Sequence, residues 1–130
     1  MLSGAGLVNL YTAICEVNVM PIETLEAADV TDRALAGTDV ACMQAVQHFA
    51  AFLGNVAGNL ALTLGAHGGV YVGGGIVPRL GSAFNAKLFR QRFEDKGRFG
   101  EYLSAIPTWV ITAPTPALIG ASYALDAQPN

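Results

Sequence analysis

Residues 38–64 carry the longest regular pattern in the chain, and this pattern restricts the fold most strongly. Apolar residues recur there at steps of three and four, which is the spacing of one face of an α-helix. They are Met43, Val46, Phe49, Ala50, Leu53, Val56, Ala57, Leu60, Ala61 and Leu64. The pattern predicts one helix of about 27 residues, which begins at Thr38 or Asp39 and ends near Gly65.

Two glycines, Gly54 and Gly58, lie inside this predicted helix. Each costs about 1 kcal/mol relative to alanine in a helix interior, so their presence needs a compensating reason. Their spacing of four residues places both on the same face of the helix. We therefore expect another backbone or a ligand to lie close against this face.

Two shorter patterns precede the long helix. Residues 5–17 have helical apolar spacing, with Ser3 available to cap the first turn. Residues 23–37 form a polar, partly helical connection, for which we expect Asp29 or Thr31 as the N-cap and the final glycine as the terminator. We expect this connection to be the most exposed part of the chain.

A strand, a glycine turn and a helix follow the long helix. The run Val70-Tyr71-Val72 is β-branched and aromatic, as in strands, and it leads into the triplet Gly73-Gly74-Gly75. A helix through Leu80, Phe84 and Leu88 is predicted next. A glycine turn at the end of a strand lets a ligand lie against the backbone.

The last third of the chain predicts more short elements. Residues 89–106 are the charged part, and they indicate two short helices broken at Gly97. Residues 108–113 predict a buried strand between prolines, and residues 116–125 a final helix. Strands separated by helices favour an α/β sheet, but two strands do not form a self-sufficient one.

Composition excludes several kinds of partner. Hydrophobic residues make up 52% of the chain and charged residues only 13%, with a net charge of −3, so we expect no nucleic-acid partner. Apolar runs stop well short of the roughly 20 residues that a membrane span needs. Cys15 and Cys42 form no disulfide framework, and no secretory signal is visible, so we expect a cytoplasmic location. The low charge favours a piece of something larger.

Few residues point to chemistry by type and spacing alone. The triplet is neither a P-loop nor a dinucleotide fingerprint, so a plain tight turn and a nucleotide contact both stay open. His48 and His67 lack a partner at metal-ligand spacing, and we expect no metal site. The charged residues 94–98 are interpreted as a solvated turn with local ion pairs rather than as acid–base groups.

Several runs are more specific than these patterns. They are Gly58-Asn59-Leu60-Ala61-Leu62, Gly68-Gly69-Val70, Gly74-Gly75-Ile76-Val77-Pro78-Arg79, Phe93-Glu94-Asp95-Lys96-Gly97-Arg98-Phe99 and Glu101-Tyr102. Together they resemble the C-terminal part of bacterial glucokinases. The resemblance extends from Ser3 to Gly120, apart from residues 19–26.

The resemblance implies an α/β fold that is part of an actin-like ATPase (ribonuclease H-like) domain, mostly helical with a few strands. Residues 1–130 would be the C-terminal, nucleotide-side part of the large domain. The complete kinase would transfer the γ-phosphoryl group of ATP, with Mg²⁺, to the 6-hydroxyl of glucose. Because the family's catalytic aspartate, sugar ligands and first phosphate loop lie upstream, we expect no catalytic residue here and an inactive chain without tightly bound ATP.

The resemblance also implies positions for site residues. The backbone of Gly73, Gly74 and Gly75 would lie against the nucleoside. Ser3 and Gly4 would approach the nucleotide or shape the sugar site, although a simple helix cap explains them equally well.

Two alternatives to a glucokinase segment stay open: a sugar-kinase-related transcriptional regulator, and a non-catalytic oligomeric module. A sheet without its upstream strands would leave apolar faces in water, and such patches mark interfaces. We therefore expect a homodimer or higher oligomer that uses the long helix or an open strand edge, and the resemblance points the same way.

Overall fold

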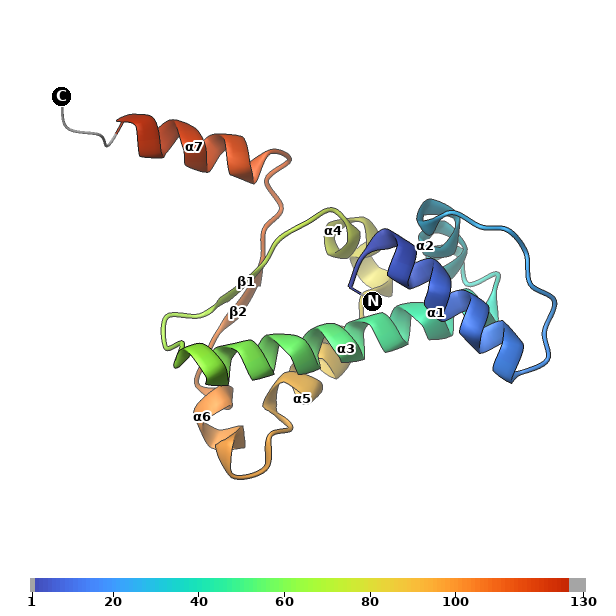
Figure 1. The fold of residues 1–130 in the computed structure, drawn as a ribbon, viewed down its shortest axis with the longest axis horizontal. Coiled ribbons are helices and arrows are strands. Elements are labelled where there is room, and N and C mark those ends of the chain that lie inside the picture. The colour runs from blue at the N-terminus through green and yellow to red at the C-terminus, as the bar shows by residue number, and fades with distance from the viewer. Residues whose placement is uncertain (1, 127–130) are drawn as a thin grey trace.

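The computed structural model describes residues 2–126, which are mostly helical with one short pair of strands (Figure 1). The elements follow in the order α1 (Gly4–Val17), α2 (Ala27–Ala36), α3 (Val40–Leu64), β1 (Val70–Val72), α4 (Ile76–Leu80), η1 (Gly81–Ala83), α5 (Ala86–Glu94), η2 (Gly97–Phe99), α6 (Gly100–Ser104), β2 (Thr108–Val110) and α7 (Pro116–Asp126). Helix α3 runs along most of the molecule, with α1 and α2 at one end and the strands at the other (Figure 1).

Side-chain hydrogen bonds mark where the first two helices begin. The Ser3 hydroxyl accepts a hydrogen bond from the Gly6 amide at 3.1 Å, which confirms the predicted cap of α1. Helix α2 starts one turn earlier than expected, with Glu26 as its N-cap. Asp29 acts from the first turn instead, where its carboxylate accepts from the Glu26 amide at 2.8 Å. The prediction of Asp29 or Thr31 as the cap was therefore wrong.

Helix α3 matches the predicted long helix closely, with 25 residues between an N-cap at Asp39 and a left-handed glycine at Gly65. The Asp39 carboxylate accepts from the Cys42 amide at 3.0 Å. Burial acts to raise the pKa of Asp39, but hydrogen bonds from the Cys42 and Ala41 backbones, with Arg33 nearby, hold that pKa below its usual value. The helix start is thus stabilised by a charged cap.

The two glycines inside α3 allow α5 to touch it backbone to backbone. A Cβ atom at Gly54 would lie under 3.0 Å from the Phe89 carbonyl oxygen, and one at Gly58 equally close to that of Phe93. Real Cβ atoms do not come so near. The expected close approach of another backbone is therefore confirmed, and the partner is α5.

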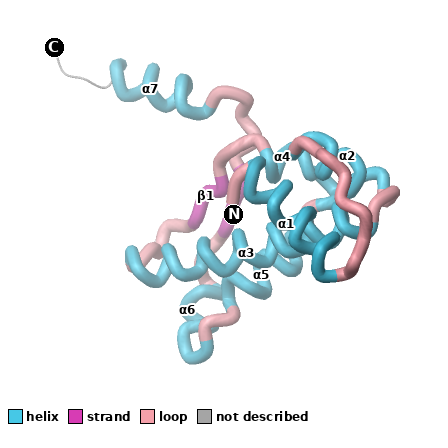
Figure 2. Tube along the Cα trace, turned by 45° about the vertical axis from the view of Figure 1, so that its right-hand side comes forward, coloured by secondary structure: helices cyan, strands magenta, loops and turns pink. Residues whose placement is uncertain are grey.

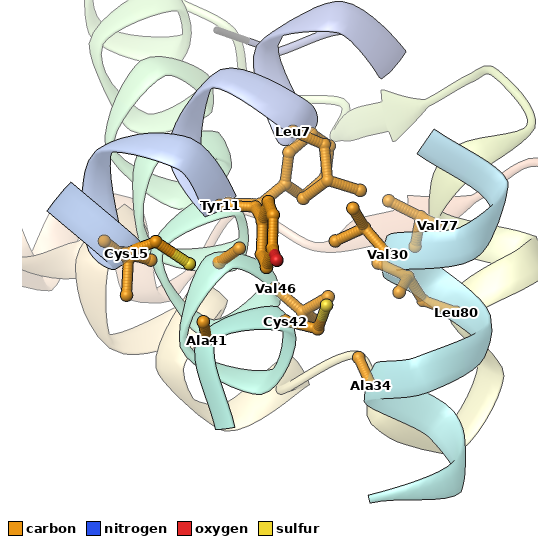
Figure 3. Close-up of a cluster of buried hydrophobic side chains, with 13 residues drawn as sticks. Leu7, Tyr11, Cys15, Val30, Ala34, Ala41, Cys42, Val46, Val77 and Leu80 are labelled. Atoms are coloured by element: carbon orange, nitrogen blue, oxygen red, sulfur yellow. The ribbon is translucent and has the colours of Figure 1, made fainter. Parts of the chain in front are cut away.

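The larger of two hydrophobic clusters fills the space between α1, α2, α3 and α4 (Figure 3). The Tyr11 side chain lies at its centre, only 2% exposed, with Leu7 and Cys42 fully buried beside it. The Glu23 amide donates a hydrogen bond to the Tyr11 hydroxyl at 3.3 Å, so the buried ring keeps a polar partner. This cluster fixes α1 and α2 to one face of α3.

The smaller cluster lies where α3, α5 and α6 meet the strands, and its buried members are Ala57, Ala61, Phe89, Phe93, Leu103 and Ile106. Asn85 is the N-cap of helix α5, and its side chain accepts from the Leu88 amide at 2.9 Å. The single helix predicted through residues 80–88 was wrong, because Gly81 adopts φ +48° and ends α4 there. The predicted break at Gly97, with φ +55°, is confirmed.

Strands β1 and β2 pair in parallel, with Val70 opposite Thr108 and Val72 opposite Val110. Within residues 2–126 this is a two-stranded sheet. The buried strand predicted over 108–113 is shorter and more exposed than expected, with Trp109 43% exposed. The reason is that β2 has one hydrogen-bonded neighbour in the described residues, so its other edge and outer face stay open.

Helix α7 confirms the predicted final helix, yet it stands away from the rest of the molecule (Figures 1 and 2). None of its residues is buried. Leu118 and Tyr123 are each 71% exposed. Within the described part of the chain, no helix combines the length and apolar character needed to cross a membrane.

Replacing Gly58 by alanine tests the contact between α3 and α5. Alanine favours the helix by about 1 kcal/mol, but its Cβ has to displace the Phe93 backbone. Overpacking of this kind costs about 1–3 kcal/mol, so we expect Gly58→Ala to lower the free energy of unfolding in urea titrations. The exposed neighbour Asn59 supplies the control, since Asn59→Ala should leave stability equal or higher. Equal stability of the two variants would contradict the close contact.

Candidate functional site

The glycine triplet forms an open turn between β1 and α4. Gly74 adopts φ +105°, a backbone conformation that favours glycine. A Cβ atom built at Gly74 or Gly75 would meet no atom within 4 Å, and one at Gly73 would meet only Ile111 Cδ1 at 3.7 Å. All three glycines are exposed, so a ligand can lie directly against the backbone of the turn.

A hollow of about 150 Å³ adjoins this turn. Apart from the triplet, its walls are apolar and come from the N-terminal segment, α3, β1 and α4: Leu2, Phe49, Leu53, Val72, Ile76 and Val77. Apolar walls beside exposed peptide groups suit a flat ring that carries polar atoms on its edge. The hollow is small and open, so it fits part of a ligand rather than a whole one.

Hydrogen bonds on either side hold the turn in place. The Val70 amide donates to the Pro107 carbonyl at 3.0 Å, and the Ile111 amide donates to the Val72 carbonyl at 2.9 Å. After the turn, Arg79 on α4 reaches the Asp32 carboxylate on α2 at 3.1 Å. The triplet is thus fixed to β2 on one side and to α2 on the other.

Ser3 and Gly4 lie next to this site in sequence and have structural roles. The Ser3 hydroxyl is engaged as the cap of α1, and a Cβ at Gly4 would lie 3.2 Å from Ala27 Cβ, where α1 crosses α2. Their neighbour Leu2 lines the hollow together with the triplet. The structure therefore brings the start of α1 to the glycine turn, while the Ser3 side chain serves the helix.

The two histidines lie outside the hollow. Both side chains are exposed; His48 faces Phe52 with ring centroids 6.5 Å apart, and His67 meets Tyr102 edge-on at 5.4 Å. Among residues 2–126, no three His, Cys, Asp or Glu side chains gather in a group that could hold a metal ion.

The charged turn near the end of α5 is held by local contacts. Arg90 pairs with Glu94, and Arg92 pairs with Asp95 at 3.5 Å. Lys96 donates to the Asn55 side chain on α3. These contacts agree with the interpretation of residues 94–98 as a solvated turn with ion pairs.

The cysteines are buried in the larger cluster, as expected of small apolar residues. Burial, with the Asp39 charge nearby, raises the pKa of the Cys42 thiol to about 12. Because the thiolate is the reactive form, Cys42 is poorly suited to nucleophilic chemistry.

The sequence patterns did not place Leu2, Phe49 or Leu53 at the triplet. The last two recur four residues apart, which assigned them to one face of the long helix. Periodicity identifies such a face but does not say which turn it meets. The sequence contained only a partial signal for them. Large apolar residues on a helix face that packs near a predicted strand are candidates to line a site.

Parallel strands joined through helices, with a glycine turn at the carboxyl end of the first strand, define a partial α/β domain. A model of the family described as Glucokinase matches residues 1–128. The chain belongs to the glucokinase family.

Individual relatives agree with this assignment. A glucokinase of Aromatoleum aromaticum is 55% identical over 125 residues, which are 96% of this chain and 38% of that protein. A glucokinase of Nitrobacter hamburgensis is 55% identical over 119 residues, 92% of this chain and 37% of that protein. The crystal structure of a glucokinase from an Antarctic psychrotroph superposes with a TM-score of 0.87 at 36% identity, covering 97% of this chain and 39% of that one. The chain thus spans less than two fifths of the length of these relatives.

Proposed function

We propose that residues 1–130 are the C-terminal, nucleotide-side part of the large domain of a longer glucokinase. The complete enzyme would transfer the γ-phosphoryl group of ATP to the 6-hydroxyl of glucose. The observation that carries the proposal is the bare glycine turn at the carboxyl end of β1, backed by an apolar hollow, in a chain of the glucokinase family. Ligands of open α/β sheets bind at this end of the strands.

In this proposal the adenosine part of ATP lies against the backbone of Gly73, Gly74 and Gly75. The apolar walls from α3 and the N-terminal segment would pack on the flat purine ring. Ser3 and Gly4 would lie near the nucleotide without touching the reacting groups. Glycine is suited to this turn because a side chain would occupy the space of the ligand.

The chemistry of transfer is assigned to other parts of the complete enzyme. Phosphoryl transfer needs ATP held with Mg²⁺ and a base within hydrogen-bond reach of the sugar hydroxyl. In this proposal Mg²⁺ would bind to the phosphates of ATP. No residue of this chain has a catalytic role. It places the enzyme in the cytoplasm, where ATP is available. The relatives described above are named glucokinase, and they give no support to the regulator or to the non-catalytic module.

The first test compares the chain alone with a chimera. The chimera carries this chain in place of the matching 125 residues of the Aromatoleum aromaticum glucokinase. In a coupled assay with ATP and glucose, we expect the chimera to turn over and the isolated chain to stay at the level of a heat-killed control. Turnover by the chain, with host kinase excluded, would overturn the proposed division of labour. A folded but inactive chimera would overturn the function itself.

The second test addresses the turn. Gly74→Val should weaken ATP or ADP binding to the chimera by about tenfold or more, because the valine side chain enters the ligand's space and disfavours φ +105°. Gly81→Val is the matched control: Gly81 also has a positive φ, +48°, with nothing within 4 Å, but it does not line the hollow. We expect similar losses of stability and unequal losses of affinity. Unchanged binding by Gly74→Val would remove the adenosine assignment.

We further propose that the chain associates with itself. Large apolar side chains are exposed on α7 and on the sheet, including Leu118, Tyr123 and Tyr71. Helix α3 is covered by α1, α2 and α5 along much of its length, so the open strand edge and the helix that follows it, α7, are favoured over the long helix as the contact. Exposed apolar patches of this kind become buried when chains associate through them.

Light scattering at micromolar concentration tests association of the chain. We expect a dimer or larger assembly, and we expect Leu118→Asp with Tyr123→Asp to shift it toward monomer, since charged groups resist burial. Leu35→Asp, at a 43% exposed position on α2, is the control and should leave the assembly intact. A folded wild-type monomer at every concentration would refute self-association.

A further inference from the structure

The Arg90 side chain on α5 donates hydrogen bonds to backbone carbonyls of the segment that leads into β2. Its Nη1 donates to the Ile106 carbonyl at 2.7 Å. Its Nη2 donates to the carbonyls of Leu103 at 3.0 Å and Ser104 at 2.9 Å. The Nε donates to the Glu94 carboxylate, one turn along the same helix. One guanidinium thus ties to α5 two carbonyls at the end of α6 and one in the connection to β2.

This arrangement uses the guanidinium for a task that few other side chains can perform. The last carbonyls of a helix have no partner within the helix, and α6 ends at Ser104. A cation at a helix C-terminus satisfies them and interacts favourably with the helix dipole. The Arg90 guanidinium also lies 4.8 Å from the centre of the Phe93 ring, and its side chain is 28% exposed. Its position is therefore set from several sides.

The connection that Arg90 holds passes directly into the strand beside the glycine turn. Pro107, next to Ile106, accepts the hydrogen bond of the Val70 amide at the start of β1. At the other end of β1, the Val72 carbonyl accepts from Ile111, and Gly73 is the next residue. Since β2 is the hydrogen-bonded neighbour of β1 in the described residues, the place of β2 determines that of β1 and of the turn after it.

We infer that Arg90 is a positioning residue for the nucleotide site. By anchoring the connection between α6 and β2, it fixes the place of β2 and therefore of the glycine turn after β1. The inference rests on the proposed function in that it names the ligand of the turn as ATP. Arg90 itself does not line the hollow. It acts through backbone carbonyls, so a cation that cannot reach all of them replaces it only in part.

A matched control lies two residues away on the same helix. Arg92 pairs with Asp95 at 3.5 Å, and its side chain is 52% exposed. The carbonyls before β2 accept from Arg90, not from Arg92. Arg92→Met therefore removes the same charge from α5 while leaving the connection to β2 in place.

Amide hydrogen exchange on the 130-residue chain tests the anchoring step. In Arg90→Met we expect the Val70 and Ile111 amides to exchange at least about tenfold faster, relative to amides inside α1, than in the wild type. Arg92→Met should leave that ratio unchanged. Arg90→Lys should fall between, because an ammonium keeps the charge but lacks the fork of donors. If Arg90→Met does not fold, Arg90→Lys against Arg92→Met carries the same comparison.

Kinetics of the chimera test the link to the nucleotide. We expect Arg90→Met to raise KM for ATP about tenfold with little change in KM for glucose, and Arg92→Met to change neither. A purely structural role would lower the active fraction and leave both KM values unchanged.

The inference is overturned if exchange at Val70 and Ile111 does not rise in Arg90→Met, or rises equally in α1. It is also overturned if both KM values stay unchanged or change equally. An inactive wild-type chimera would refute the proposed function alone, since the exchange experiment needs no activity.

Discussion

The contact between the backbones of α3 and α5 supports most of what lies around it. It exists because Gly54 and Gly58 leave α3 without side chains at the points where the Phe89 and Phe93 carbonyls arrive. Helix α5 carries Arg90, which holds the approach to β2. Helix α3 also contributes to the candidate site directly, because its side chains line the hollow. A bulkier residue at either glycine would move α5 and everything attached to it.

The candidate site lies at the seam between two hydrophobic clusters rather than inside either one. Leu53 and Val72 pack against both clusters, and both also line the hollow. A site at such a seam gains walls from elements far apart in sequence, because each cluster fixes a different set of helices. Its floor is bare backbone, which a side chain would fill. Geometry of this kind depends on long-range packing more than on any local motif.

The sequence predicted local features better than their surroundings. Capping and periodicity placed α1, α3 and α7 to within a few residues, and the propensity cost of Gly54 predicted a close neighbour. The division near Gly81 was missed because nothing local distinguishes a glycine with positive φ from others in a glycine-rich chain. The glycine turn was predicted as a candidate site, whereas the wall from Phe49 was not, since periodicity is silent about which element a helix face meets. The burial of β2 was overestimated for a related reason, because burial depends on neighbours that a strand pattern does not name.

Under the proposed function, affinity for ATP should depend on more than the glycine turn. A ligand gains most from a backbone that is already in place before binding, because ordering it on binding costs free energy. Here β1 is held by three-residue pairing with β2, and the outer face of that pair exposes the stacked rings of Tyr71 and Trp109. A two-stranded sheet is only marginally stable by itself. The turn is therefore as rigid as the contacts that hold β2. Under the proposed function, the anchoring of β2 by α5 and the covering of its open edge are then conditions for nucleotide binding in the complete enzyme.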